Sequence, residues 1–445
     1  MRILQVSHGL PPHEKAGVEN YTFYLSSALA RLGHSVTIFC REENPEKEEF
    51  SIREERLDGL LVIRVVNNLK KIHDPKVYYE NQYFDEIFKN VLETQKPQIV
   101  HFQHFIALSA NLINLAKDLG FPTLLSIHDF FILCHRIHLI DRENRVCPGP
   151  LYGLNCYFCL GDYFPPRELV RRTELLLKLK DLLPFPWIKW TKRFFIPPRL
   201  IPLEGYEVFH RYRYMFEVLK RVDQILVPSE FVLKMYLKYY KKFRKKMRRM
   251  TWGIQPVKPS LKTEVNEKRI RFCYYGSILP HKGVHLLIES LRRLPREKLL
   301  LTLFGDKTGW NAGYYQELYE SSNGLPVEFK GSFDRSLLSE VLKDQDVVVL
   351  PSLCPETFSF VIREANAMGI PVIGSRIGAI PEAIRDGING FLFKPGDVRE
   401  LTECMSKFIE YPRLIYEMRR NMKRQKMMEE HASELIALYE ELLRK

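Results

Sequence analysis

The sequence predicts an α/β protein with two doubly wound parallel sheets, one in each of two domains. Short apolar runs alternate with amphipathic helical stretches along most of the chain, and such alternation favours parallel strands covered by helices. With 445 residues and 45% apolar content, the chain is long enough to bury two cores. We place a first domain at 1–256, a second at 257–420 and a final helix at 421–445, with a Pro- and Lys-rich linker at 255–262.

The first domain opens with a strand, a loop and a helix. Arg2–Ser7 is a buried apolar run, residues 8–18 form the loop, and Glu19–Arg31 has one apolar helical face. No G-x-G-x-x-G fingerprint follows the strand, which argues against a dinucleotide-dependent dehydrogenase. Further strands are expected at Ser35–Cys40, Leu61–Val66, Ile99–Phe102, Thr123–Ile127 and Asp223–Pro228, with helices near Tyr83–Thr94 and Ala107–Leu119 and after an N-cap at Ser229.

Three histidines fall at or just after the ends of these strands, where parallel sheets bind their ligands. They are His101, His104 and His128. A lone histidine at a strand end is more often a structural hydrogen-bonding group than a site residue. We nevertheless select His128 as a site residue, with Asp129 placed to orient its ring.

The second domain carries a phosphate-binding pattern. A loop at 276–283 joins the strand Ile270–Tyr275 to the helix Val284–Leu294, and a loop of this kind offers free N–H groups and the positive end of the helix dipole. Lys282 adds a mobile cation, so the loop suits a diphosphate. Gly305 follows the next strand and would help to form the wall around a nucleotide base. The remaining strands are expected at Leu299–Phe304, Val327–Phe329, Val347–Leu350 and Val372–Gly374.

Two acids follow the strand Val347–Leu350, one in a loop and one in a helix. Glu356 and Glu364 are separated by seven residues, about two turns of helix, so both carboxylates can point to the crevice at the edge of the sheet. An ionised carboxylate can accept hydrogen bonds from both hydroxyls of a ribose. A solvated helix face has the same spacing, so the pair alone is weak evidence.

The stretch from Pro351 to Phe391 and its neighbours resembles glycosyltransferase family 4, whose members are retaining, metal-independent enzymes of the GT-B architecture. The resemblance rests on the Glu356-x(7)-Glu364 pair, on Gly378-Ala379-Ile380-Pro381-Glu382 and on Asp386-Gly387-Ile388-Asn389-Gly390-Phe391-Leu392. It implies two Rossmann-like domains that face each other across a cleft, with the acceptor on the side of the first. It also implies that the final helix at 421–445 crosses back to the first domain, with Leu435, Leu438, Tyr439 and Leu442 facing protein.

The resemblance implies roles for individual residues. His128 and Glu356 would act beside the donor sugar and Lys282 beside the leaving diphosphate, while Glu364 would bind the ribose. The full donor-binding set is Gly17, Gly276, Ser277, Lys282, Gly283, Gly305 and Glu364.

Two positions depart from the family pattern. Ala16-Gly17 keeps one glycine of the usual pair, and Ser277 stands where the family has an arginine. Phosphate binding must therefore depend on Lys282, on the helix terminus, or on another base such as Arg363 or Arg376.

Four cysteines lie close together in the sequence, at Cys134, Cys147, Cys156 and Cys159. In a cytosolic chain, such clustering favours a metal over disulfides, because four thiolates form a closed tetrahedral site. We therefore predict a structural zinc or iron-sulfur site here. Unliganded thiols that pack a loop are the alternative.

The positive charge is concentrated in one segment. Residues 167–255 hold 22 Lys/Arg and 8 Asp/Glu, whereas the whole chain has a net charge of +13. The insertion at 163–215 interleaves cations with Trp187, Trp190, Phe194 and Phe195, as in basic helices that lie on anionic membranes. A second basic tract at 234–249 contains an aromatic stripe, Tyr236, Tyr239, Tyr240 and Phe243, which we expect to be half core and half membrane-facing. A buried insertion helix or an oligomer contact is the alternative, and the segment lacks any nucleic-acid-binding module.

These patterns predict a metal-independent retaining glycosyltransferase that uses a nucleoside-diphosphate sugar and needs no cofactor for catalysis. Its acceptor would be a glycan or a lipid-linked saccharide, and its other partner an anionic membrane surface, with no nucleic acid. A nucleotide-sugar 2-epimerase and a non-catalytic scaffold that binds nucleotide-sugar or membrane are the rival hypotheses. The chain lacks a signal-peptide h-region and a long apolar run, so we expect a cytoplasmic protein at the inner face of the membrane.

Overall fold

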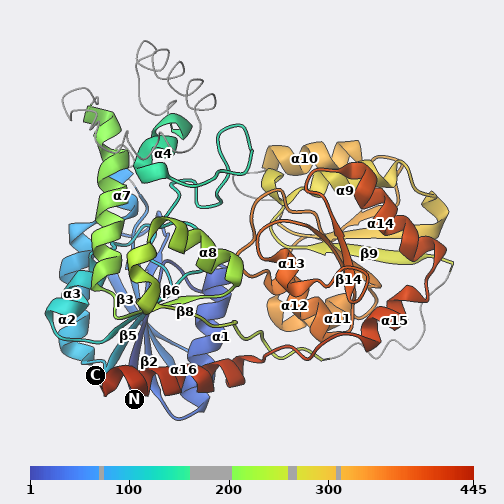
Figure 1. The fold of residues 1–445 in the computed structure, drawn as a ribbon. Coiled ribbons are helices and arrows are strands. Elements are labelled where there is room, and N and C mark those ends of the chain that lie inside the picture. Colours follow the sequence, from blue (N-terminus) through green and yellow to red (C-terminus); the bar gives the residue numbers. More distant parts are fainter. Residues whose placement is uncertain (70–74, 161–202, 259–267, 307–311, 445) are drawn as a thin grey trace.

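The computed structural model has two parallel-sheet domains side by side (Figure 1). It describes residues 1–69, 75–160, 203–258, 268–306 and 312–444. The predicted doubly wound two-domain architecture, GT-B, is confirmed. Most of the basic insertion expected at 163–215, including Trp187, Trp190, Phe194 and Phe195, lies outside the described residues.

The sheet of the first domain has eight strands in the order β3-β4-β2-β1-β5-β6-β7-β8. All neighbours are parallel except β3 and β4. The strands are β1 (Arg2–Ser7), β2 (Ser35–Glu42), β3 (Ile52–Leu57), β4 (Leu60–Val66), β5 (Ile99–Phe102), β6 (Thr123–Ser126), β7 (Gln224–Val227) and β8 (Met247–Arg249). The helices are α1 (Gly17–Arg31), α2 (Gln82–Gln95), α3 (Leu112–Asp118), α4 (Leu154–Cys159), α7 (Leu203–Arg221) and α8 (Glu230–Tyr239).

The sheet of the second domain has six parallel strands in the order β11-β10-β9-β12-β13-β14. They are β9 (Ile270–Tyr275), β10 (Leu299–Phe304), β11 (Val327–Phe329), β12 (Val347–Leu350), β13 (Val372–Ser375) and β14 (Gly390–Phe393). The helices are α9 (Val284–Leu291), α10 (Ala312–Ser321), α11 (Leu338–Leu342), α12 (Phe360–Ala367), α13 (Ile380–Ala383), α14 (Val398–Glu410) and α15 (Leu414–Arg420). Leu, Val and Ile on both faces of the central strands form one continuous core.

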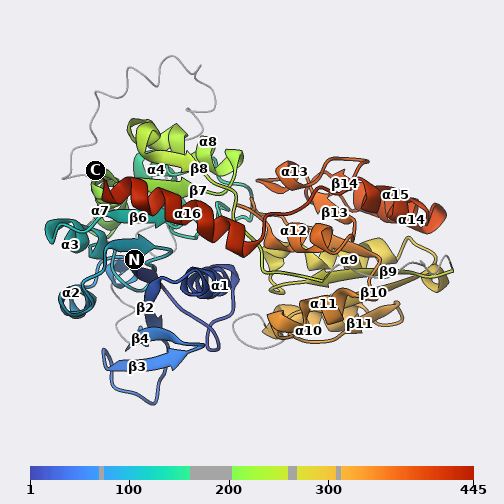
Figure 2. The ribbon, with the colours of Figure 1, turned by 90° about the horizontal axis from the view of Figure 1, so that it is seen from below.

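The last helix, α16 (Met428–Leu443), returns to the first domain and lies beside α1 (Figure 2). Its apolar face, with Leu435, Leu438, Tyr439 and Leu442, is buried, so the expected crossing is confirmed. Two buried polar contacts help to hold it in place. His431 bonds through Nε2 to the hydroxyl of Tyr21 at 2.6 Å, and the hydroxyl of Tyr439 bonds to Nδ1 of His101 at 2.7 Å.

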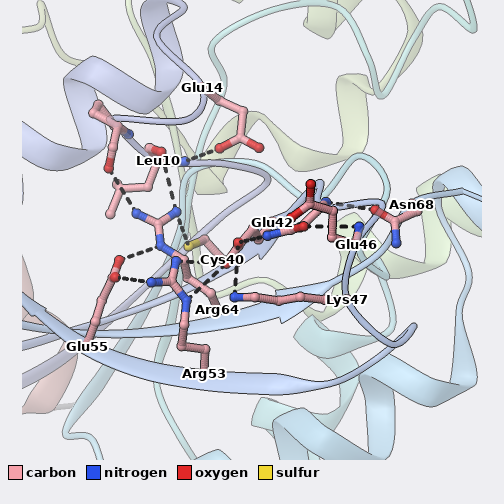
Figure 3. Close-up of polar contacts among 12 residues, drawn as sticks. Leu10, Glu14, Cys40, Glu42, Glu46, Lys47, Arg53, Glu55, Arg64 and Asn68 are labelled. Carbon is pink, nitrogen blue, oxygen red and sulfur yellow. Dashed lines mark hydrogen bonds and ion pairs between the residues drawn. The ribbon is translucent and has the colours of Figure 1, made fainter.

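A buried arginine anchors the loop that follows β1 (Figure 3). Arg64 of β4 is fully buried, and its guanidinium donates to the carbonyl oxygens of Leu10, at 3.4 Å, and Pro11, at 2.9 Å. The carboxylate of Glu55 on β3 neutralises it at 2.6 Å. Because a buried guanidinium needs partners for its N–H groups, this network holds the loop that leads to Gly17.

The aromatic stripe at 234–249 differs from expectation. Tyr236 and Tyr240 are fully buried, and Phe243 is buried as well, all in the core of the first domain. Tyr239, the fourth ring of the stripe, is half-buried. Three of the four rings therefore lie in the core, so the expected division into one half core and one half membrane-facing is wrong. The exposed residues between the rings are the cations Lys238, Lys241 and Lys242.

Candidate functional site

A cleft of ≈ 1030 Å³ lies between the two domains, at the carboxyl ends of both sheets. It is lined by residues of α1 and of the loops after β1 and β6 on one side, and by the loops after β9, β10, β11 and β12 on the other. Of the predicted site residues, the cleft wall contains Gly17, His128, Gly276, Ser277, Lys282, Gly305, Glu356 and Glu364. The structure thus brings into one cavity residues that are far apart in the sequence.

Lys282 and Glu356 form an ion pair on the wall of the cleft. The ammonium of Lys282 lies 2.7 Å from Oε1 of Glu356, and the side chains are 23% and 16% exposed. The hydroxyl of Ser352 donates to the same oxygen at 2.8 Å. Burial opposes ionisation of both groups, but the attraction between the two opposite charges is stronger. The pKa of Glu356 is therefore lowered and that of Lys282 is raised. Lys282 has three N–H donors, so it can hold Glu356 and also contact a phosphate oxygen.

Glycine is required where the predicted phosphate-binding loop at 276–283, called the phosphate loop below, turns into α9. Gly283 has φ +73°, and a Cβ there would overlap the carbonyl oxygen of Pro351. This close approach places Lys282, its neighbour, against the loop that carries Glu356. A Cβ on Gly305 would likewise clash with the carbonyl oxygen of Gly276, so the ends of β9 and β10 pack without side chains between them.

Glu364 lies deeper, on α12. Its side chain is 4% exposed, and its carboxylate accepts from Arg335 and from the hydroxyl of Tyr275, the latter at 3.3 Å. Arg335 was not anticipated from the sequence, because it lies outside every motif. The bases proposed to compensate for Ser277 lie elsewhere. Neither Arg363, which stacks on Phe358, nor Arg376, which pairs with Asp386, is among the residues that line the cleft.

His128 reaches the cleft from the end of β6. Its Nε2 lies 2.9 Å from Oε1 of Gln103, and burial, with nearby His104, lowers its pKa to about 3, so the ring is neutral at neutral pH. The expectation that Asp129 orients this ring is wrong. Asp129 instead binds Nε2 of His104 at 3.0 Å, because its side chain and that of His128 leave consecutive positions in different directions.

A side-chain hydrogen bond joins the two halves of the site. The hydroxyl of Thr357 donates to the backbone carbonyl of His128 at 2.6 Å. Because Thr357 follows Glu356 in the sequence, this bond places the carboxylate of the second domain near the histidine of the first. A second contact across the cleft packs the ring of His138 against that of His281, with the centroids 4.3 Å apart and the ring planes tilted by 30°. Sequence reasoning gave neither contact, since neither residue pair forms a motif.

Two family models match consecutive parts of the chain. The model for glycosyltransferase family 4 matches residues 16–146, and the model for glycosyl transferases group 1 matches residues 260–427. The chain belongs to the group 1 glycosyltransferases of family 4 type. The second match covers the phosphate loop and both cleft acids, and the first covers Gly17 and His128.

Curated relatives match this chain over part of their length. A sulfoquinovosyl transferase of Arabidopsis thaliana is 29% identical over 201 residues, which are 42% of this chain and 37% of that protein. A D-inositol 3-phosphate glycosyltransferase of Mycolicibacterium smegmatis is 27% identical over 142 residues, or 31% of this chain and 32% of the relative. The chain thus spans about two fifths of the first relative and about a third of the second.

Solved structures agree over the whole chain. Sucrose-phosphate synthase from Thermosynechococcus elongatus superposes with a TM-score of 0.68 at 18% identity, covering 100% of this chain and 99% of that one. Anabaena HepE in complex with UDP gives a TM-score of 0.64 at 15% identity, covering 99% of this chain and 100% of that one. These likenesses establish the shared fold.

The four clustered cysteines do not form a metal site in the described part of the structure. All four are free thiols, and no group of three His, Cys, Asp or Glu side chains among the described residues could hold a metal ion. Burial raises the pKa of Cys134 to about 11 and also raises the pKa of the other three thiols. Neutral thiols that pack a loop fit this arrangement better than the zinc or iron-sulfur site that the spacing suggested.

No helix among the described residues combines the length and the apolar composition that crossing a bilayer requires. Six exposed cations of the first domain lie close together in the sequence, on the 3₁₀ turn and the edge strand that follow α8. They are Lys241, Lys242, Arg244, Lys245, Arg248 and Arg249.

Proposed function

We propose that this protein is a metal-independent retaining glycosyltransferase that moves a sugar from a nucleoside-diphosphate sugar to a glycan or lipid-linked acceptor. The observation that carries the proposal is the meeting of Lys282, Glu356, Glu364 and His128 on the wall of one interdomain cleft of ≈ 1030 Å³. A cavity of this size accommodates a nucleotide sugar. Neighbouring structures of the same fold were solved with UDP and with ADP, so the base stays open.

The geometry supports a division of roles. Lys282 would neutralise the charge that grows on the diphosphate as it leaves, a preorganised interaction worth about 3 kcal/mol. Glu356, held by Lys282 and Ser352, would bind the sugar hydroxyls, and Glu364 the ribose. His128 is held neutral and its Nε2–H donates to Oε1 of Gln103, so its Nδ1 can accept a hydrogen bond from a sugar hydroxyl. Attack by the acceptor on the face from which the diphosphate departs would retain the anomeric configuration.

The exposed cations after α8 support a membrane surface as the second partner. Lys241, Lys242, Arg244 and Lys245 are all exposed, and each cation near an anionic bilayer contributes about 1 kcal/mol. Binding there would bring the first domain, which holds the acceptor side of the cleft, to a lipid-linked substrate.

The test is a panel of UDP-, GDP- and ADP-sugars, scored for release of nucleoside diphosphate with and without vesicles that contain anionic lipid. We expect one donor to be turned over in EDTA, with the product retaining its anomeric configuration by NMR. Conversion of the donor to its C2 epimer without an acceptor would favour the epimerase hypothesis. Absence of both reactions, with nucleotide still bound, would indicate a scaffold.

A further inference from the structure

A second cation lies at the donor side of the cleft. Arg335 follows β11 and begins a short 3₁₀ helix, whose N-cap Asp334 accepts from the backbone N–H of Ser336. Its guanidinium lies over the ring of Tyr275, 5.9 Å from the centroid. Tyr275 is the last residue of β9 and directly precedes the phosphate loop. Arg335 therefore lies in the cleft wall beside the strand that leads into the predicted phosphate site.

Arg335 also covers the acid assigned to the ribose. Its side chain is 25% exposed, whereas that of Glu364, its ion-pair partner, is 4% exposed. Arg335 binds Oε1 of this carboxylate, whereas Oε2 lies 3.3 Å from the hydroxyl of Tyr275, which has a nearer acceptor in the carbonyl oxygen of Val361 at 2.8 Å. A ribose diol that bonds to both carboxylate oxygens must therefore displace the guanidinium.

The phosphate loop itself offers fewer donors than the sequence suggested. The N–H groups of Lys282 and Gly283 donate within the loop, to Leu279 and Pro280. The N–H of His285, in the first turn of α9, donates to the hydroxyl of Tyr314 at 3.2 Å. These amides are already engaged, so binding of a diphosphate depends more strongly on cationic side chains.

Few cations are in place to help. Among the described residues that line the cleft, the Lys and Arg side chains are Lys15, Lys282 and Arg335. Lys15 is exposed on the opposite domain. Arg335 is thus the cation on the donor side, besides Lys282, that can replace the arginine missing at Ser277.

We propose that Arg335 is the second phosphate-binding cation of the donor site and that it moves from Glu364 to the diphosphate when the donor binds. This inference rests on the proposed function. The ribose hydroxyls would take the place of the guanidinium on Glu364, and the freed guanidinium would bind phosphate oxygens through its planar fork of N–H groups. No bond is made or broken in this step, and one ion pair is exchanged for another.

The test compares ligands with and without the diphosphate. Uridine, guanosine and adenosine and their diphosphates are titrated against the full chain, and the preferred base is then used for Arg335→Ala and Arg335→Gln. Gln keeps a donor for Glu364 but loses the charge. We expect both variants to bind the diphosphate about 10- to 100-fold more weakly, as for one lost charge-assisted hydrogen bond. The nucleoside should bind as in the wild type or more tightly, and salt should weaken diphosphate binding less.

Arg376→Ala is the matched control, because Arg376 is an arginine of the same domain that lies outside the cleft and pairs with Asp386. It should leave both affinities unchanged. Equal losses for nucleoside and diphosphate in the Arg335 variants would make Arg335 a support for Glu364 alone and overturn the inference. Unchanged diphosphate affinity would also overturn it. If the wild type binds none of the three diphosphates, the proposed function itself fails.

Discussion

Replacing Lys282 with methionine should reduce both turnover and stability, for separate reasons. Methionine keeps most of the side-chain volume but removes the charge. Loss of one preorganised donor to the leaving group costs about 3 kcal/mol of transition-state stabilisation, or roughly 100-fold in kcat. The variant also leaves Glu356 without its cation in a site where its side chain is 16% exposed. Removing one partner of a buried pair costs about 3–5 kcal/mol, so with this partial exposure we expect about 2–3 kcal/mol.

A double variant separates the two effects. Lys282→Met with Glu356→Gln removes both charges, and the amide can still accept from Ser352, so most of the lost stability should return while turnover should stay low. Stability is measured by urea unfolding, and turnover by release of nucleoside diphosphate from the donor selected in the panel. A single variant that keeps its kcat within about threefold, or a double variant that regains wild-type turnover, would refute the role assigned to Lys282.

Three further predictions follow from individual contacts. Gly283→Ala should lower the free energy of unfolding by about 1–3 kcal/mol, because it puts a side chain at a positive φ and against the carbonyl of Pro351. The variant should also lose nucleotide binding in a titration, and an affinity equal to that of the wild type would contradict this prediction. Arg64→Met should destabilise the first domain by about 3 kcal/mol, because it leaves the buried carbonyl oxygens of the loop without donors. Urea unfolding measures this loss, and an unchanged urea midpoint would contradict the prediction. The stability of the fold should decrease below about pH 6.5, because burial lowers the pKa of both His128 and His431 to about 3. The contribution of these neutral rings to folding stability is complete above the pKa of the unfolded state and is lost as the pH falls towards 3. A Tm that stays flat from pH 8 to pH 4 would show that these rings titrate normally.

The central strands could be predicted from the sequence because they are buried on both faces and so form continuous apolar runs. Arg2–Ser7, Ile99–Phe102 and Ile270–Tyr275 begin and end where the sequence placed them. The edge strands β3, β8 and β14 were missed, whereas the edge strand β11 has the bounds Val327–Phe329 that the sequence predicted. Ile52–Leu57 alternates exposed and half-buried residues and contains four charged side chains, a pattern that does not differ from that of a loop.

The helix expected near Ala107 starts only at Leu112, because Ala107 has φ +55°, a conformation that ends a helix and that no local pattern indicates.

The candidate site shows the same division. Residues fixed by a motif, such as Lys282 and Glu356, could be placed at the edge of a parallel sheet because every loop after a strand ends there. Hydrogen-bond and ion-pair partners that come from distant segments of the chain could not be predicted. Nothing near Glu364 in the sequence indicates that Arg335 will cover it. For His128, the sequence favoured the adjacent Asp129 as hydrogen-bond partner, whereas the actual partner, Gln103, follows the neighbouring strand of the sheet.

The returning helix links the fold to the chemistry. Tyr21 of α1 bonds to His431 of α16, and its ring also lies 4.7 Å from that of His128 and 5.4 Å from that of Trp252, measured between centroids. Trp252 belongs to the segment that leads out of the first domain, so both crossings of the chain between the domains end on the same aromatic cluster. Protein interiors are close-packed and transmit small shifts. A change in the orientation of the second domain would therefore move His128, both through this aromatic cluster and through Thr357. The position of His128 is therefore coupled to the closure of the cleft, and if the proposed function holds, binding energy from the nucleotide, far from the sugar, can be used to align it.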